Sequence, residues 1–278
     1  MLFAFVLCAG LVMTSCETAD PAGKDPNNSD IIVFADPIVK QSCVYVFDTD
    51  GDGEISYGEA AAVTDLSDIT LRFVKEFLTF DEFQYFINVK SIPNDLFKEC
   101  NYLESIVLPK SIQTIGSNAF RECTSLKNIE FQEGLKEIGM EAFFGCHSLT
   151  KIEFPEGLET IGDHAFVGCR SLTNIEFSEG LETIGSLAFL SCTSLTNIEL
   201  PEGLKEIGGD AFYSISLTSI FVKAEIPPYF SYSPFPFNDV MTIYVPSNKV
   251  DVYKNTDNWS RYHKYIVGYN YENNKVVE

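Results

Sequence analysis

Three consecutive segments decide the fold: LKNIEFQEGLKEIGMEAFFGCHS (126–148), LTKIEFPEGLETIGDHAFVGCRS (149–171) and LTNIEFSEGLETIGSLAFLSCTS (172–194). They align without a gap at a period of 23 residues, and the pattern extends back to Leu103 and forward to residue 222 with the loss of one residue. Repeats of this length with regular leucines are typical of solenoids, in which each unit stacks on its neighbours. The sequence therefore predicts a β-rich solenoid built on a ladder of parallel strands.

Each copy contains a short stretch with the alternation of a strand. Ile152 and Phe154 are two residues apart, so they share one face, and Glu153 points to the opposite face. Gly157 and Gly162 supply permissive backbone at the bends. We therefore expect columns of apolar side chains inside the stack and a column of glutamates outside it.

The remainder of the copy, residues 163–169, is long enough for one helical turn that carries Ala165 and Phe166 inward. About six buried apolar side chains at roughly 2 kcal/mol each do not offset the ordering of a whole copy at about 1–2 kcal/mol per residue. A single copy is therefore unstable, and neighbouring copies must cover both of its open faces.

The full pattern L-x-x-I-x-F-P-E-G-L-x-x-I-G-x-x-A-F-x-G-C resembles the BspA-type leucine-rich repeat of bacterial surface proteins, over about residues 80–222. It departs from the commoner leucine-rich repeat in carrying a cysteine where an asparagine ladder is usual. The resemblance implies adhesion to host extracellular-matrix proteins or to other cells. We expect an N-terminal capping region with a partial repeat (68–102), the repeats (103–222) and a small α+β C-terminal cap (223–278).

Inside the cap, the aromatic residues of 241–269, Trp259 among them, are expected to cover the last repeat rather than to form a binding face. The cysteines of the repeats form one column at constant spacing: Cys100, Cys123, Cys146, Cys169 and Cys192. Their side chains point in parallel, so we expect buried free thiols, with disulfides or a bound metal as the alternatives. Cys43 is expected to be a core residue of a helix.

The outward glutamates form a second column, Glu130, Glu153, Glu176 and Glu199. Like charges about one strand spacing apart repel each other unless solvent, cations or a partner relieve them. The column is either a solvated surface that prevents edge aggregation or a docking surface for a basic ligand or protein. No aromatic platform is expected to recur on the outward strand positions, which disfavours a carbohydrate-handling lipoprotein.

A different motif precedes the repeats. FDTDGDGEISYGEA (47–60) matches an EF-hand calcium loop: the predicted ligands are Asp48, Asp50, Asp52, the carbonyl of Glu54, Ser56 through water, and both carboxylate oxygens of Glu59. Gly53 supplies the turn. An entering helix is predicted from Asp36–Pro37 through Phe47, and an exiting helix in YGEAAAVTDL (57–66), within a helical module at 36–67.

A sensor function is disfavoured because sensor EF-hands occur in pairs, and a second hand is missing here. The loop also resembles half of a dockerin, but no second half follows. An extracellular site with an expected Kd of about 10⁻⁴ to 10⁻³ M would be constantly loaded. We therefore expect Ca²⁺ to fasten the helices that lead into the solenoid.

The first residues, MLFAFVLCAGLVMTSCE, are apolar and end in small residues before Cys16. This layout is typical of a signal peptide (1–15), too short to span a membrane. Met13–Cys16 resembles the lipobox of bacterial lipoproteins, which implies that Cys16 is lipidated and that residues 16–35 are a flexible tether. No basic residue precedes Lys24, a departure from the usual signal peptide. The expected location is the outer membrane and the cell surface.

The formal net charge is −21, with 40 Asp and Glu against 19 Lys and Arg. Such a chain repels nucleic acid and favours divalent cations and basic protein surfaces. The three histidines, His147, His164 and His263, fall at unrelated positions, and no catalytic constellation is present, so an enzyme is not expected. The preferred hypothesis is a monomeric surface protein that binds a protein or glycoconjugate. The alternative is a structural or accessory subunit of a bacterial surface assembly.

Overall fold

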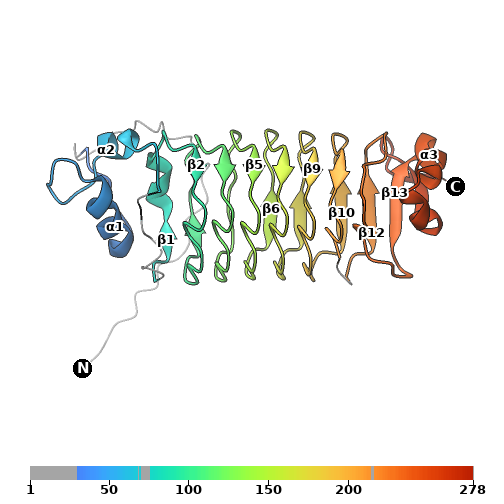
Figure 1. Cartoon of the computed structure of the whole chain (residues 1–278), viewed down its shortest axis with the longest axis horizontal. Helices are drawn as coiled ribbons and strands as arrows, with labels where there is room; N and C mark the ends of the chain where they lie inside the picture. The colour runs from blue at the N-terminus through green and yellow to red at the C-terminus, as the bar shows by residue number, and fades with distance from the viewer. Residues whose placement is uncertain (1–29, 68, 70–75, 214–215, 278) are drawn as a thin grey trace, which may run out of the picture. The chain divides into compact units, whose positions relative to one another are not determined.

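A computed structural model describes residues 30–67, 69, 76–213 and 216–277. The chain divides into two units, Met1–Asp30 and Ile31–Glu278, and the description below concerns the second. The predicted signal peptide, the predicted lipidation site Cys16, residues 17–29 of the tether and Ile215 lie outside the described residues. Within the second unit, the 23-residue repeats form successive rungs that stack side by side (Figure 1).

Each regular rung contributes to two columns of short parallel strands. One column follows the I-x-F stretch, as predicted, and the other follows the T-I or E-I dipeptide that precedes the second glycine of the repeat. The first column contains β1 (Thr79–Phe80), β3 (Ser105–Ile106), β6 (Lys151–Glu153), β8 (Asn174–Glu176), β10 (Asn197–Leu200), β12 (Ser219–Val222), β13 (Thr242–Pro246) and β14 (Ile266–Asn270). The second contains β2 (Ser91–Ile92), β4 (Thr114–Ile115), β5 (Glu137–Ile138), β7 (Thr160–Ile161), β9 (Thr183–Ile184) and β11 (Glu206–Ile207).

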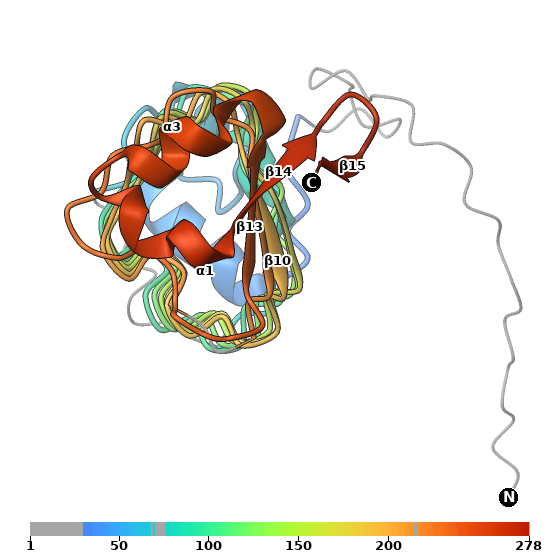
Figure 2. The ribbon, with the colours of Figure 1, turned by 90° about the vertical axis from the view of Figure 1, so that its right-hand side faces the viewer.

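Burial along the strands follows the predicted alternation. Ile152 is fully buried and Phe154 nearly so, while Lys151 and Glu153 on either side are exposed. In the register of the ladder, Ile152 lies beside Ile175 and Glu153 beside Glu176. Identical positions of successive repeats therefore form continuous columns, and the rungs superpose when viewed end-on (Figure 2).

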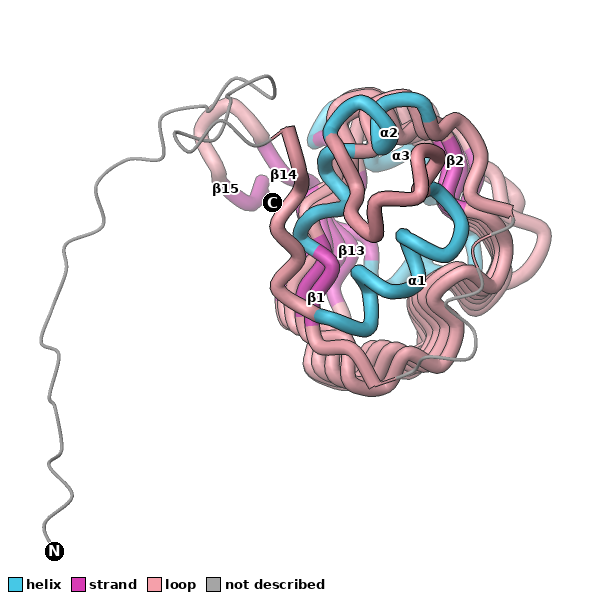
Figure 3. The backbone as a smooth tube through the Cα atoms, turned by 90° about the vertical axis from the view of Figure 1, so that its left-hand side faces the viewer, coloured by secondary structure: helices cyan, strands magenta, loops and turns pink. Residues whose placement is uncertain are grey.

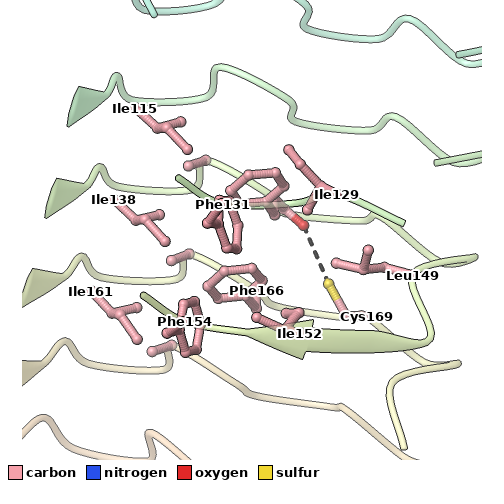
Figure 4. Packing of buried hydrophobic residues seen from close by; sticks show 14 of the residues in the cluster. Ile115, Ile129, Phe131, Ile138, Leu149, Ile152, Phe154, Ile161, Phe166 and Cys169 are labelled. Carbon is pink, nitrogen blue, oxygen red and sulfur yellow. Dashed lines mark hydrogen bonds between the residues drawn. The ribbon is translucent and has the colours of Figure 1, made fainter. Parts of the chain in front are cut away.

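The centre of the stack is a column of phenylalanine rings. From Phe97 to Phe212, consecutive rings lie 4.9–5.2 Å apart between centroids with interplanar angles of 16° or less. The rings of Phe131 and Phe154 form a second column beside the first, and Phe154 meets Phe166 edge-on (Figure 4). Aromatic stacking of this kind adds about 0.5–1.5 kcal/mol per pair beyond the area that it buries.

The glycines of the bends are required for a reason that the sequence did not indicate. Gly162 and Gly185 have ordinary backbone angles, but the backbone of the preceding rung occupies the space that a side chain would need. A Cβ added to Gly185 would lie 2.5 Å from the amide nitrogen of Asp163. Gly157 and Gly162 were expected to supply permissive backbone at the bends, but neither has a positive φ, and glycine is needed there for close stacking.

The segment after Gly162 was expected to form a helical turn, and the structure instead contains hydrogen-bonded turns. His164 and Gly168 have positive φ values of 58° and 72°, which interrupt any helix. Equivalent residues of the other repeats share this conformation, including Leu187 at φ 57°. Ala165 and Phe166 nevertheless point inward and are fully buried, as predicted.

The cysteine column lies in the core as free thiols, and Cys43 is also buried and free. The thiols of the repeats donate hydrogen bonds to carbonyls of the preceding repeat, which the sequence of one repeat does not show. Cys169 Sγ donates to the carbonyl of Phe143 at 3.4 Å (Figure 4), and Cys146 Sγ donates to that of Phe120 at 3.2 Å. The carbonyl of Phe143 already accepts from the amide of Cys146, so the thiol gives this buried carbonyl a second donor that joins the two rungs.

The two ends of the stack are covered by helices. At the N-terminal end, α1 (Pro37–Phe47), α2 (Tyr57–Ala62) and the 3₁₀ helix η2 (Asp81–Tyr85) lie over the first rungs (Figure 3). At the other end lie the 3₁₀ helix η3 (Ser247–Lys249), α3 (Val250–Asn255) and the 3₁₀ helix η4 (Trp259–Tyr265) (Figure 2). Trp259 is fully buried and donates from Nε1 to the carbonyl of Pro228 at 2.7 Å, so its predicted covering role is confirmed.

The last element is a hairpin that the sequence did not predict. β14 continues the parallel ladder beside β13, and β15 (Lys275–Val277) pairs with β14 in the antiparallel sense. In the end-on view the hairpin projects from the outline of the rungs (Figure 2). None of the helices in the described part of the chain is both long and apolar enough to cross a membrane.

Candidate functional sites: the acidic loop and the outward strand face

The predicted calcium loop lies between α1 and α2. Asp36 caps α1 by accepting a hydrogen bond from the amide of Ile38, and Pro37 is the first residue of this helix, as predicted. The predicted bounds of α1 are confirmed, whereas α2 ends at Ala62, earlier than the predicted stretch 57–66. The two helices hold the ends of the loop in place.

Three of the six predicted ligand residues converge within the loop. Carboxylate oxygens of Asp48, Asp50 and Asp52 all lie within 4.8 Å of one another. Backbone amides orient these carboxylates: Gly51 and Gly53 donate to the two oxygens of Asp48 at 2.7 and 2.9 Å. Both glycines have positive φ values, 78° and 83°, so the loop needs glycine at these positions.

The other three predicted ligand residues have partners of their own. The carboxylate of Glu54 pairs with Lys40 at 2.6 Å. This pairing does not involve the backbone carbonyl of Glu54, which is the predicted ligand atom. Ser56 caps α2, and its hydroxyl accepts from the amide of Glu59 at 3.1 Å. Glu59 Oε2 accepts from the amide of Ser56, while its Oε1 reaches back to the amide of Thr49 at 2.6 Å.

These hydrogen bonds keep Glu59 ionised. The amides of Ser56 and then Thr49 stabilise the carboxylate and lower the pKa of Glu59 to about 2. The residues present fit a calcium ion, because the cluster consists of oxygen donors only and three carboxylates already converge. Each hydrogen-bonded carboxylate oxygen retains a second lone pair that an ion can use.

A short N-terminal segment pairs with this loop, a contact that no sequence pattern indicated. The amide of Ile32 donates to the carbonyl of Ile55 at 2.7 Å, and Ile31 forms an antiparallel bridge with Ser56. Ile32 and Ile55 are both buried. The chain itself therefore supplies a short pairing segment to the predicted calcium loop.

The second candidate site is the outward strand face, defined as the outward positions of the first strand column from Glu130 to Tyr244. The four predicted glutamates lie on it at matching positions of successive repeats: Glu130, Glu153, Glu176 and Glu199. All four are exposed, with side-chain exposures of 60%, 59% and 55% for Glu153, Glu176 and Glu199. The predicted outward column is therefore present.

Two lysines relieve part of the charge repulsion on this face. Lys151 pairs with Glu153 and, at 3.3 Å, with Glu176 of the next rung. Lys223 pairs with Glu199 at 2.6 Å and with Glu179 at 3.1 Å. Burial alone would lower the pKa of Lys223, but its two glutamate partners leave it raised. One ammonium group thus bridges two carboxylates at each of two places on the face.

Three hollows follow one another along the same face. Hollows of about 450 and 350 Å³ are lined by the glutamate positions, the first by Glu130 and Glu153 and the second by Glu176 and Glu199. A third hollow of about 530 Å³ lies at the C-terminal end, where Lys223, Tyr269 and Tyr271 line it.

The outward face changes from acidic to aromatic at its C-terminal end. In the register of the ladder, Phe221 lies beside Glu199 and Tyr244 lies beside Phe221. The expectation that no aromatic platform occurs on the outward positions was therefore wrong for the last two rungs. Alignment on Ile220 and Ile243 would have revealed both aromatics, but the preceding repeat is one residue shorter in sequence, which interrupts the period.

The repeats match a known family of leucine-rich repeats. Residues 90–218 match the BspA type leucine rich repeat region in six copies. No curated protein matches the chain. The repeat region of this chain belongs to the BspA-type leucine-rich repeat family.

Solved leucine-rich repeat structures resemble the chain in part. A T. pallidum leucine rich repeat protein is 30% identical, with 63% of this chain and 76% of that chain covered and a TM-score of 0.48. A leucine rich cell surface protein of Faecalibacterium prausnitzii is 27% identical, with coverages of 54% and 43% and a TM-score of 0.45. A leucine-rich repeat protein of Bacteroides ovatus is 25% identical, with coverages of 60% and 58% and a TM-score of 0.40.

Proposed function

We propose that this chain is a cell-surface binding protein that presents its outward strand face to a protein or glycoconjugate, with one structural calcium ion in the loop 48–59. The observation that carries the proposal is the alignment of exposed carboxylates and hollows along one face of the stack. An extended surface of repeated groups suits a large ligand, because each rung adds a small contact in register with the next.

The sequence supports a proposed location and a proposed partner. The signal-peptide pattern and the lipobox resemblance at Cys16 support an outer-membrane lipoprotein whose tether holds the stack at the cell surface. A monomer anchored in this way would meet host extracellular-matrix proteins, the partners that the family resemblance implies. The net charge of −21 favours a basic protein surface over an anionic one.

The contacts of the acidic loop support a fastening role for calcium. α1 and α2 pack on the segment before the first regular rung: the ring of Phe47 meets Phe86 at 5.6 Å, and that of Tyr57 meets Tyr85 at 4.9 Å. An ion bound by Asp48, Asp50 and Asp52 would fix the angle between the two helices and thereby hold this cover on the stack.

The binding proposal is tested by reversing the charge of the outward face. The variant Glu153→Lys/Glu176→Lys is compared with Glu159→Lys/Glu182→Lys, which changes two exposed glutamates of the same spacing beside the second strand column. Each variant and the wild type are titrated onto immobilised extracellular-matrix proteins. We expect the first variant to lose binding and the control variant to retain it, with unchanged circular dichroism spectra for both.

The second candidate function is an accessory subunit of a bacterial surface assembly, in which the same face contacts other envelope proteins. Parallel titrations on matrix proteins and on purified envelope proteins separate the two candidates. Binding to neither group, or equal binding by the two charge-reversed variants, would contradict a role for the outward face.

A further inference from the structure

The hollow at the C-terminal end of the outward strand face differs in chemistry from the two beside it. Its lining residues come from the ends of β12, β13 and β14 and from the turn of the β14–β15 hairpin. This hairpin projects from the outline of the rungs (Figure 2). Its volume is about 530 Å³, the largest of the three hollows. It is lined by Glu202, Lys223, Glu225, Pro246, Ser247, Asn248, Tyr269, Asn270, Tyr271 and Glu272.

Aromatic rings form one side of this hollow. Tyr269 meets Phe221 at 5.2 Å and Tyr244 at 5.6 Å between ring centroids, in both cases edge-on. Tyr271 meets Tyr269 at 4.9 Å and donates from its hydroxyl to the carbonyl of Tyr244 at 3.1 Å. These contacts fix the rings, so the hollow has a rigid aromatic wall before any ligand arrives.

Carboxylates also line this hollow. Glu202, Glu225 and Glu272 are exposed on the lining, against one lysine, Lys223. Lys223 is already engaged by Glu199 and Glu179, and Glu225 has Lys249 at 3.4 Å. Among the described residues, Glu202 and Glu272 have no ion-pair partner of their own, so the hollow has negative charge available for a ligand.

We propose that this hollow binds an arginine side chain of a protein ligand, an inference that rests on the proposed binding function of the outward face. A guanidinium group is planar, stacks on tyrosine rings and donates two parallel hydrogen bonds to a carboxylate. Tyr269 and Tyr271 supply the rings, and Glu272 and Glu202 supply the carboxylates. On the same side of the stack, the chain's own Lys151 and Lys223 each lie between two carboxylates, an arrangement that an arginine of a ligand could also adopt.

The charge of the lining decides against other ligands. A sulfated or phosphorylated glycan would be repelled by three carboxylates, and the one lysine of the lining is already paired with Glu199 and Glu179. A neutral sugar would stack on tyrosine but would leave the carboxylates without a charged partner. An extended basic peptide lying along the outward strand face would place successive cations near the glutamate column and end with an arginine at the aromatic wall.

The test uses blocked tripeptides as probes: acetyl-triarginine amide, acetyl-trilysine amide and the uncharged isostere acetyl-tricitrulline amide. Binding to the full chain is measured by calorimetry at constant ionic strength. We expect the arginine peptide to bind at least about fivefold more tightly than the lysine peptide, and the citrulline peptide to show no binding. Equal binding of the arginine and citrulline peptides would overturn the proposal, because charge would then play no part.

Two variants place the binding site. Tyr269→Leu removes a stacking ring and is expected to weaken binding of the arginine peptide at least about fivefold. Glu272→Gln removes a carboxylate from an exposed turn residue and is also expected to weaken binding of the arginine peptide. It tests the site even if Tyr269→Leu loosens the hairpin. Tyr102→Leu, which alters an exposed tyrosine near the opposite end of the stack, is the control and should leave binding unchanged.

The outcomes separate this inference from the proposed function. If Glu153→Lys/Glu176→Lys weakens binding of the arginine peptide while Tyr269→Leu and Glu272→Gln do not, the end hollow is not the arginine site, although the outward face remains a binding surface. A neutral oligosaccharide provides the second comparison. If it displaces the arginine peptide, and if Tyr269→Leu abolishes binding of the oligosaccharide, the hollow is a sugar site and the proposal is wrong.

Discussion

The stacking distance of the rungs can be tested with one methyl group. A Cβ at position 185 would lie 2.5 Å from both the amide nitrogen of Asp163 and the carbonyl carbon of Gly162, about 0.9 Å inside the 3.4 Å at which ordinary contact begins. Both atoms belong to the backbone of the preceding rung, so no side-chain rotation can relieve the overlap. Gly185→Ala must therefore push two rungs apart.

The loss follows from what holds those rungs together. The amide of Gly185 donates to the carbonyl of Ile161 at 2.8 Å, and a local separation weakens this hydrogen bond, which contributes about 0.5–1.5 kcal/mol. Forcing an extra methyl group into a packed interior costs a further 1–3 kcal/mol or so. We expect Gly185→Ala to reduce the free energy of unfolding by about 2–4 kcal/mol.

The matched control is Gly58→Ala in α2. A Cβ at position 58 has only Ser56 Oγ nearby, at 3.7 Å, and the residue is exposed. Because alanine favours a helix over glycine by up to about 1 kcal/mol, this variant should be as stable as the wild type or slightly more so. The same chemical change thus has opposite effects at the two positions.

Urea unfolding followed by circular dichroism measures the whole stack, and fluorescence of Trp259, the single tryptophan, reports on the C-terminal cap. In a stack with nearest-neighbour coupling, a defect in the middle can separate the two signals. A change below about 0.5 kcal/mol for Gly185→Ala, with both signals coincident, would refute the stacking distance on which the fold rests.

Further predictions concern strain, thiols and calcium. Leu187→Asn should raise the free energy of unfolding by about 0.5–1 kcal/mol, measured in urea, because leucine is strained at φ 57° and asparagine tolerates it; a decrease would contradict this explanation. Burial raises the pKa of Cys192 to about 12 from 9.0, so the folded thiol stays protonated where the unfolded thiol ionises. The free energy of unfolding should therefore fall as pH rises from 9 towards 12, and it should not depend on this thiol below pH 9. The wild type should show this fall, and Cys192→Ala should show less of it. In the native protein, none of the six described thiols should react with a thiol reagent at pH 8. Calcium at 10 mM should raise the free energy of unfolding by about 1.4–2.7 kcal/mol for a Kd of about 10⁻⁴ to 10⁻³ M; Asp50→Ala, which removes a predicted ligand side chain, should lose this gain, Asp65→Ala should keep it, and an equal gain in both would exclude the loop as the site.

The sequence was sufficient wherever a residue's role is decided within its own repeat. The alternation of Ile152, Glu153 and Phe154 depends only on the two faces of a strand, and the structure reproduces it. The bounds of α1 depend on a local cap at Asp36 and a proline at its first position, and they were predicted to the residue. Features of this kind depend only on residues that are close in sequence, so the sequence is enough to predict them.

Features that depend on contacts between rungs could not be predicted in the same way. The glycine at 185 is required by the backbone of residues 162 and 163, and the thiol of Cys169 is oriented by the carbonyl of Phe143. Both partners lie one repeat earlier, and a pattern within one repeat does not show how closely two repeats approach. The pairing of Ile32 with Ile55 was missed for a related reason, because two isoleucines before a helix carry no periodic signal.

The aromatic end of the outward strand face combines both situations. Phe221 and Tyr244 occupy the position that glutamate holds in the preceding rungs, so their outward direction follows from the repeat itself. Tyr269, by contrast, reaches them only because the unpredicted β14 extends the ladder by one more strand. A repeat protein of this kind can therefore change its surface chemistry at the end of the stack, where the period relaxes and the cap begins, while the core columns remain in register. In this chain, the boundary is therefore the place where the outward strand face can bind a ligand group that the uniform acidic surface before it would not select.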